Sequence, residues 1–233
     1  MDIPIEAIAK ATEEVAKTTG KGIDLVQSSG GFLAEFIREP LAEWIGIQTD
    51  NLKARRIENR IDLQLRVQAK YEAAAITNYR QIPFSIGVPL LEAATLEESP
   101  ELRDLWANLI VNFSNQDSKI GIEKSFVSVL RDLSPLDVRI LEKIYSMPEV
   151  EKHCVLTEHL PDYAEFELPR PPGEKLTQRA LPTADVQLSI TNLFRLQCLQ
   201  TAKYMGGPDV LNTVYTTTFG HALFEACTSP VGT

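Results

Sequence analysis

The stretch VPLLEAATLEESPELRDLWANLIVNFSN, from Val88 to Asn115, predicts a helical hairpin. In its second arm, Ser99 can cap the helix, and Pro100 suits the first helical position because it has no N–H to leave unpaired. Pro89 is expected at the same position in the first arm. Apolar side chains of the second arm recur every three or four residues, which places them on one stripe facing a core. The stripe consists of Leu102, Leu105, Trp106, Leu109, Ile110 and Phe113.

Residues 50–77, before the hairpin, predict one long helix. They contain no Gly or Pro, and Ile57, Ile61 and Leu65 recur at four-residue spacing. Basic side chains are expected on the outer faces of this helix: Lys53, Arg55, Arg56, Arg60, Arg66 and Lys70. Two interpretations remain open for them. In the first, Arg55, Arg56 and Arg60 contact nucleic-acid phosphates. In the second, the basic side chains form salt bridges with the acidic hairpin and do not bind nucleic acid. We favour the second interpretation.

The rest of the chain predicts further helices and then a change of character. Helices are expected at 120–133 and 135–147, the second capped by Ser134 with Asp137 three residues later. Residues 148–182 contain six prolines and only short β-prone groups. A helix after Thr183, a β-branched segment at 213–217 and a closing helix at 219–227 follow.

We therefore expect a mainly α fold with two domains. An N-terminal multi-helix domain covers 1–147, and a small α+β domain covers 148–233. The alternative boundary lies near residue 134, because the helix that Ser134 caps could serve as the first element of the second domain.

Three segments resemble the bacterial abortive infection alpha (Abi-alpha) family. They are REPLAEWIG (38–46), DNLKARRIENR (50–60) and the hairpin sequence leading to LRDLSPLDVRIL (130–141). The resemblance spans residues 5–145. It implies a helical protein associated with defence against phage, and the family supplies no known catalytic residue to carry over. The resemblance thus implies a biological setting and no particular reaction.

The C-terminal part is similar to winged-helix regulators, on the pattern of SITNLFRLQCLQ (189–200) and VYTTTFGHALFEAC (214–227). The side chains expected to face outward from its recognition helix are Gln187, Thr191, Asn192 and Arg195, and Lys203 is expected on the wing. Two cations are few for a module that reads DNA. We therefore favour a protein partner, with a DNA-binding transcriptional regulator as the alternative.

Composition and motifs give little sign of chemistry. The chain has 233 residues, a net charge of −9 and three cysteines without paired spacing, which favours a reduced, cytoplasmic location. His153, Cys154 and His159 lack the ligand spacing of a zinc site. The chain also lacks a phosphate-binding loop and a nucleophile elbow. We expect no metal, no cofactor and no catalytic residue.

The N-terminal region carries the remaining candidate surface. Residues 4–19 predict an amphipathic helix, and residues 20–47 contain an apolar face formed by Phe32, Phe36, Trp44 and Ile45. Three glutamates and a single arginine accompany that face, a poor match to membrane insertion. We favour packing within the helical domain or against a second copy, with a membrane-associated effector as the alternative. The sequence thus predicts a non-enzymatic phage-defence protein that recognises a phage or host protein.

Overall fold

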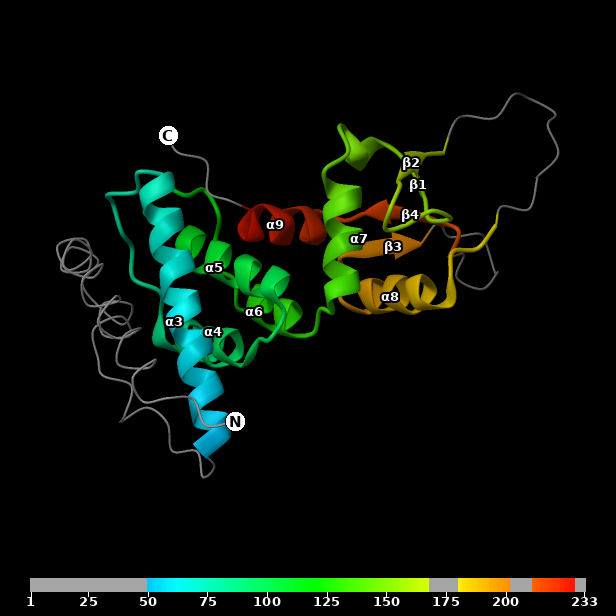
Figure 1. Ribbon diagram of the computed structural model, residues 1–233. Coiled ribbons are helices and arrows are strands. Elements are labelled where there is room, and N and C mark those ends of the chain that lie inside the picture. Colours follow the sequence, from blue (N-terminus) through cyan, green and yellow to red (C-terminus); the bar gives the residue numbers. More distant parts are fainter. Residues whose placement is uncertain (1–49, 168–179, 202–210, 229–233) are drawn as a thin grey trace, which may run out of the picture. The chain divides into compact units, whose positions relative to one another are not determined.

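The structure is a computed structural model that describes residues 50–167, 180–201 and 211–228 (Figure 1). Contacts divide the chain into two units. Unit 1 comprises Met1–Arg131 and Ala226–Thr233, and unit 2 comprises Asp132–Glu225. The fold is mainly α with a small antiparallel sheet in the C-terminal part, as predicted. The helix capped by Ser134 belongs to unit 2.

Unit 1 is built around one buried helix. In the described part of unit 1 the helices are α3 (Asp50–Ala73), α4 (Phe84–Leu96), α5 (Pro100–Ser114) and α6 (Lys124–Arg131), and α9 ends in it at Cys227. Helix α3 packs against α4 and α5, and α4 packs against α6. Every residue from Trp106 to Ser114 is buried, so α5 is covered on all sides along that length. The predicted stripe is buried with the exception of Leu105, which is half-buried.

The two arms of the hairpin begin differently. Ser99 caps α5 as predicted, since its side chain accepts a hydrogen bond from the Leu102 backbone N–H at 3.4 Å. The prediction for Pro89 was wrong, because α4 begins at Phe84 and Pro89 lies inside it. The Pro83 carbonyl accepts hydrogen bonds from two N–H groups of the first turn, so the helix is established before Pro89 is reached. Pro89 then removes a single helical hydrogen bond.

Two buried asparagines on α5 hold the end of the chain in unit 1. Asn108 Nδ2 donates to the Cys227 carbonyl at 2.7 Å. Asn112 Nδ2 donates to the carbonyls of Ala226 at 2.9 Å and Thr228 at 3.0 Å. Carbonyls in the last turn of a helix have no partner within the helix, so the two amides satisfy groups that would otherwise be unpaired. These bonds explain why two polar residues occupy a buried helix face.

Unit 2 combines helices with a four-stranded antiparallel sheet. Its elements are α7 (Pro135–Tyr145), the 3-10 helix η1 (Val150–Lys152), β1 (Val155–Leu156), β2 (Glu165–Phe166), α8 (Ala184–Arg195), β3 (Leu199–Thr201), β4 (Thr213–Thr216) and most of α9 (Thr218–Cys227). The strand order is β2-β1-β4-β3. Val155 lies opposite Phe166 on one side and Val214 on the other, and Leu199 lies opposite Thr216. Strand β4 and helices α8 and α9 lie close to the predicted positions.

A tyrosine fixes the start of α9 against the sheet in unit 2. Tyr145 Oη donates to the Cys198 carbonyl at 2.5 Å and accepts from the Thr217 backbone N–H at 3.3 Å. Gly220 lies so close that an added Cβ would overlap both Tyr145 Oη and the Cys198 oxygen. Glycine is therefore required at position 220 by close packing, and the reason does not involve its backbone angles.

Candidate functional site: the outer face of helix α8

Helix α8 is held in unit 2 by its inner face and by a buried carboxylate. Val186, Ile190 and Leu193 are at most 3% exposed. Phe194 is half-buried. A polar contact with α8 comes from α7. It involves Asp137, whose side chain is 1% exposed.

Asp137 joins the start of α7 to the middle of α8. It forms the predicted capping box with Ser134, whose backbone N–H donates to Oδ2 at 2.7 Å. Ser189 Oγ donates to Oδ1, and Asn192 Nδ2 donates to Oδ2 at 2.9 Å. A buried carboxylate needs such donors, since burial without them would be costly. The same residue therefore starts one helix and fixes the rotation of the other.

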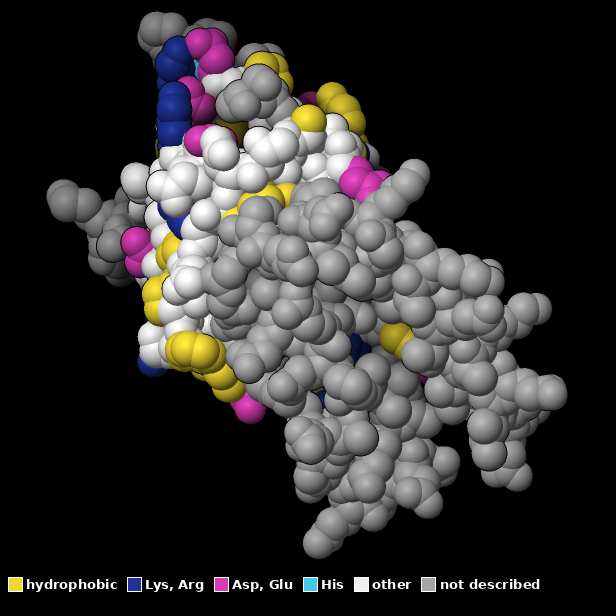
Figure 2. Space-filling model, turned by 90° about the vertical axis from the view of Figure 1, so that its left-hand side faces the viewer, with side chains coloured by type: hydrophobic (Ala, Val, Ile, Leu, Met, Phe, Trp, Pro, Cys, Tyr) yellow, Lys and Arg dark blue, Asp and Glu magenta, His cyan; other side chains and the backbone are white. Residues whose placement is uncertain are grey.

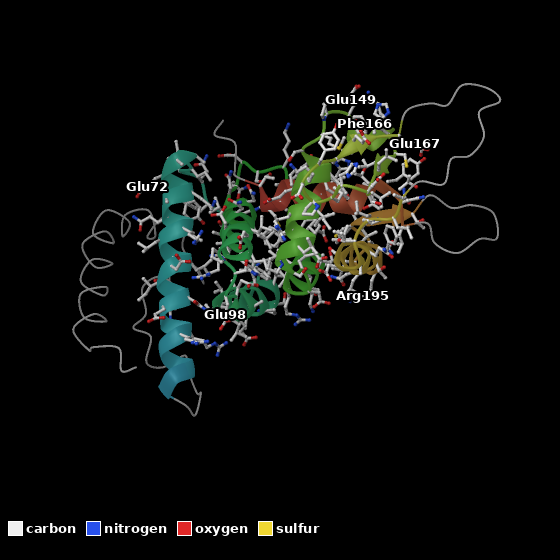
Figure 3. All side chains as sticks on the ribbon, turned by 45° about the vertical axis from the view of Figure 1, so that its right-hand side comes forward. Glu72, Glu98, Glu149, Phe166, Glu167 and Arg195 are labelled. Carbon is white, nitrogen blue, oxygen red and sulfur yellow. The ribbon has the colours of Figure 1, made fainter. Side chains whose placement is uncertain are left out.

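The outer face of α8 is defined here by Ala184, Leu188, Thr191 and Arg195, which recur at three- or four-residue spacing. Leu188 is 73% exposed, the largest value among the large hydrophobic side chains that the structure describes. Arg195 lies at the end of the helix (Figure 3). Its guanidinium pairs with Asp132 at 3.3 Å and donates to Asn192 Oδ1 at 2.8 Å. The face thus presents an apolar side chain, a hydroxyl and a cation that already has an anionic partner.

The predicted recognition residues are distributed over more than this face. Thr191 and Arg195 are exposed as expected. Asn192 was expected to face outward, but it is half-buried, because its amide binds Asp137 and the Asp132 carbonyl. Gln187 is half-buried and donates to the Pro182 carbonyl at 2.8 Å. Lys203 lies outside the described residues.

The basic side chains of α3 mainly form salt bridges within unit 1. Arg55 Nη1 pairs with Glu98 at 3.2 Å, at the turn between α4 and α5 where Figure 3 labels Glu98. Asp104 of α5 pairs with Arg66 at 3.4 Å and with Lys70 at 3.0 Å. Salt bridges to the hairpin, as predicted, are therefore present for Arg55, Arg66 and Lys70.

A second acidic residue, Asp62, completes this network from α3. Asp62 binds Arg66 at 2.8 Å and Arg103 of α5 at 3.0 Å. The hydrogen bond that Arg66 donates to Asp62, more than any other contact, raises the pKa of the Arg66 guanidinium. These partly buried charges are committed to one another and leave little for a phosphate group.

Two other α3 arginines have different surroundings. Arg56 is half-buried. Arg60 was expected on an outer face, but it is only 6% exposed. Arg60 lies three residues before Leu63 and seven residues before Val67. This spacing places Arg60, Leu63 and Val67 on the same, buried side of the helix.

Other candidate groups have structural roles. Cys154, Cys198 and Cys227 are free and buried. Burial raises the pKa of the Cys198 thiol to about 12 and that of the Tyr145 hydroxyl to about 12, so both groups stay neutral at physiological pH. The ring of His153 contacts that of Phe166 with centroids 4.6 Å apart. Within the residues that the structure describes, no group of three or more His, Cys, Asp or Glu side chains could hold a metal ion.

The candidate oligomer or membrane face, formed by Phe32, Phe36, Trp44 and Ile45, lies outside the described residues. None of the described helices is both long enough and apolar enough to cross a membrane.

Sequence patterns missed three features of the site. Leu188 falls between the apolar positions of α8, so the pattern did not predict its role on the outer face. Asp137 was recognised as a cap, but its bonds to α8 join residues 52 and 55 positions apart. A polar residue repeated at four-residue spacing on an apolar helix, as with Asn108 and Asn112, was a usable sign of buried hydrogen bonds.

Comparison with known proteins supplies the family. A family model described as abortive infection alpha matches residues 53–227. The matched region starts later than the resemblance noted in the sequence and extends through the sheet and α8 to the end of α9. No curated protein and no solved structure matches the chain. Because the matched region covers well over half of its residues, this chain belongs to the abortive infection alpha family.

Proposed function

We propose that this protein takes part in abortive-infection defence against phage, and that it acts by binding a phage or host protein through the outer face of α8. Family membership supports the setting. The exposure of Leu188 carries the proposal for the mode of action. Leu188 lies in the middle of α8, and covering its apolar side chain with a partner protein would lower the free energy of the complex. The absence of a recognisable catalytic motif from the sequence favours recognition over catalysis.

The order of elements in unit 2 supports a winged-helix interpretation. Strand β4 pairs with both β1 and β3, and α8 directly precedes the β3–β4 hairpin. In a winged helix the last strand likewise lies between the first strand and its hairpin partner, and the helix before the hairpin is the recognition helix. In this interpretation α8 is the recognition helix, and β2 is an additional edge strand.

Charge favours a protein partner over DNA. Residues 132–225 contain thirteen Asp and Glu against eight Lys and Arg. The cation on the outer face of α8, Arg195, is paired with Asp132. A DNA-binding surface draws most of its affinity from cations that neutralise phosphates. An acidic unit whose recognition helix exposes leucine is better suited to a protein surface.

The proposal is tested by phage challenge of cells that express the full chain or a single variant. Leu188→Asp should abolish protection against a susceptible phage, because a carboxylate would be buried without a partner in the complex. Leu188→Met keeps the apolar surface and should protect like the wild type. Circular dichroism and thermal melting should show that both variants fold, since the side chain is exposed. Equal protection by Leu188→Asp and Leu188→Met would overturn the proposed use of α8.

Co-purification from infected cells separates protein recognition from DNA reading. A protein that is retained by the wild type and by Leu188→Met, and is lost with Leu188→Asp, supports the proposal. A salt-dependent gel shift tests the alternative, in which Arg195→Ala weakens sequence-preferring DNA binding. Sequence-preferring binding that depends on Arg195 and not on Leu188 would replace protein recognition by DNA regulation.

A further inference from the structure

Helix α3 has an apolar row on the side opposite its contacts with α4 and α5. Its buried side carries Leu63, Val67 and Tyr71, which are at most 8% exposed and pack toward α4 and α5. Ile61, Leu65 and Ala69 recur at four-residue spacing on the opposite side. Leu65 is 44% exposed, Ala69 is exposed and Ile61 is half-buried. Figure 2, which views the molecule from the left-hand side of Figure 1, shows small groups of hydrophobic side chains on the described part of this face.

Such a row has the geometry of a helix-packing surface. Side chains four residues apart form a ridge along a helix, and ridges of this kind fit into the groove of a second helix. We call Ile61, Leu65 and Ala69 the α3 ridge. Two small or branched side chains beside a leucine would allow close approach of another helix, and covering Leu65 would remove apolar surface from water. The ridge thus lies opposite the contacts with α4 and α5 that place the other side of the helix in the core.

The preceding part of the same chain has the length to cover the ridge. Forty-nine residues lie before α3 and join it directly at its first residue. Helix α3 has 24 residues and is therefore about 36 Å long. A segment twice as long as the helix can return along it, and direct attachment gives the segment a far higher effective concentration than a separate molecule has.

The composition of that segment also matches the ridge. The sequence predicts an amphipathic helix at 4–19 and an apolar face at Phe32, Phe36, Trp44 and Ile45. Residues 1–49 contain eight acidic and four basic side chains, whereas α3 contains six basic and four acidic ones. The net negative charge of the segment disfavours its association with an anionic surface.

We propose that residues 4–47 of the same chain dock on the α3 ridge. The apolar faces of the segment and of the ridge then cover each other within one molecule. This docking is independent of the proposed use of α8, because it involves unit 1 alone.

Hydrogen exchange of the full chain, followed by mass spectrometry of its peptides, tests the docking. Leu65→Lys places a charge on the ridge and should speed exchange in peptides from 4–47 by about tenfold relative to Leu65→Met. Ala69→Glu should act in the same direction. Peptides of α5 should exchange at an unchanged rate in every variant, which excludes general unfolding. Leu188→Lys introduces the same charge in unit 2 and should leave 4–47 unaffected.

Three results would overturn the proposal. The first is equal exchange of 4–47 in Leu65→Lys and Leu65→Met. The second is exchange of 4–47 at the rate of an unstructured peptide in the wild type. The third is protection of 4–47 that disappears on dilution together with loss of a dimer in light scattering, because the ridge would then be covered by a second copy. None of these outcomes tests the proposed role of Leu188 in phage protection, so the two proposals can be refuted independently.

Discussion

Replacement of Asp137 by alanine should destabilise unit 2 more than any other single loss of charge within it. The carboxylate is 1% exposed and accepts hydrogen bonds from the Ser134 N–H, Ser189 Oγ and Asn192 Nδ2. Alanine would remove the acceptor and leave three donors without it. Ser189 is itself only 5% exposed, so a water molecule cannot readily replace the carboxylate as the acceptor for its hydroxyl.

The expected cost follows from these contacts. Loss of a helix cap costs about 1 kcal/mol. Each hydrogen bond to a buried charged group contributes about 1.5–3 kcal/mol. With some relaxation of the neighbouring side chains, we expect the free energy of unfolding to fall by about 4 kcal/mol. For a unit of this size, that corresponds to a fall in melting temperature on the order of 20 °C.

Urea unfolding followed by circular dichroism measures the effect, with Asp132→Ala as the matched control. Asp132 is also an aspartate that faces α8, but its side chain and that of Arg195 are 37% and 59% exposed. Removal of such an exposed pair should cost less than about 1 kcal/mol. If the two variants lose the same free energy within about 1 kcal/mol, Asp137 does not hold α8 through its buried hydrogen bonds.

Further variants test the packing, the charges and the pH dependence. Gly220→Ala should lower the free energy of unfolding by about 2 kcal/mol, and Tyr145→Phe in the same chain should recover only part, since the Cys198 carbonyl still obstructs the new methyl group; full recovery in urea melts would contradict this. Asp104→Ala should cost about 1 kcal/mol at low salt and less at high salt, because Lys70 loses its partner; a salt-independent loss would refute the electrostatic cause. Burial raises the pKa of Cys198 and of Tyr145 to about 12, so the stability that both neutral groups contribute is complete below about pH 9 and is lost as the pH rises to about 12. Melting temperatures over this range should fall less steeply for Cys198→Ala than for the wild type, and equal slopes would disprove the linkage.

Local signals in the sequence predicted the elements well. Ser99 with Pro100, and Ser134 with Asp137, fixed two helix starts, because a cap and its partner lie within one turn of each other. The absence of Gly and Pro predicted the long helix α3, which ends at Ala73, four residues before the expected end. These signals depend on neighbours in the sequence, so no tertiary information was needed to read them.

The errors concern faces and partners. Arg60 was placed on an outer surface although it shares the buried side of α3 with Leu63. Pro89 was given the first position of α4, which starts five residues earlier. Asn192 was expected to face solvent, and it binds a carboxylate of another helix. In each case the deciding contact lies outside the local pattern.

The hairpin from Val88 to Asn115 shows which features the sequence determines and which depend on the tertiary structure. By itself the sequence determined that Ser99 caps α5, that the apolar stripe of α5 turns inward and that the chain resembles the family to which it belongs. Helical periodicity fixes the direction of each side chain relative to its own axis, and that is sufficient for these conclusions. Only the tertiary structure decided that the other side of α5 is buried too, that Asn108 and Asn112 bind the end of the chain, and that Leu188 stays exposed. The asparagine bonds join residues more than a hundred positions apart in the sequence. Such contacts depend on how the elements pack, which helical periodicity does not determine.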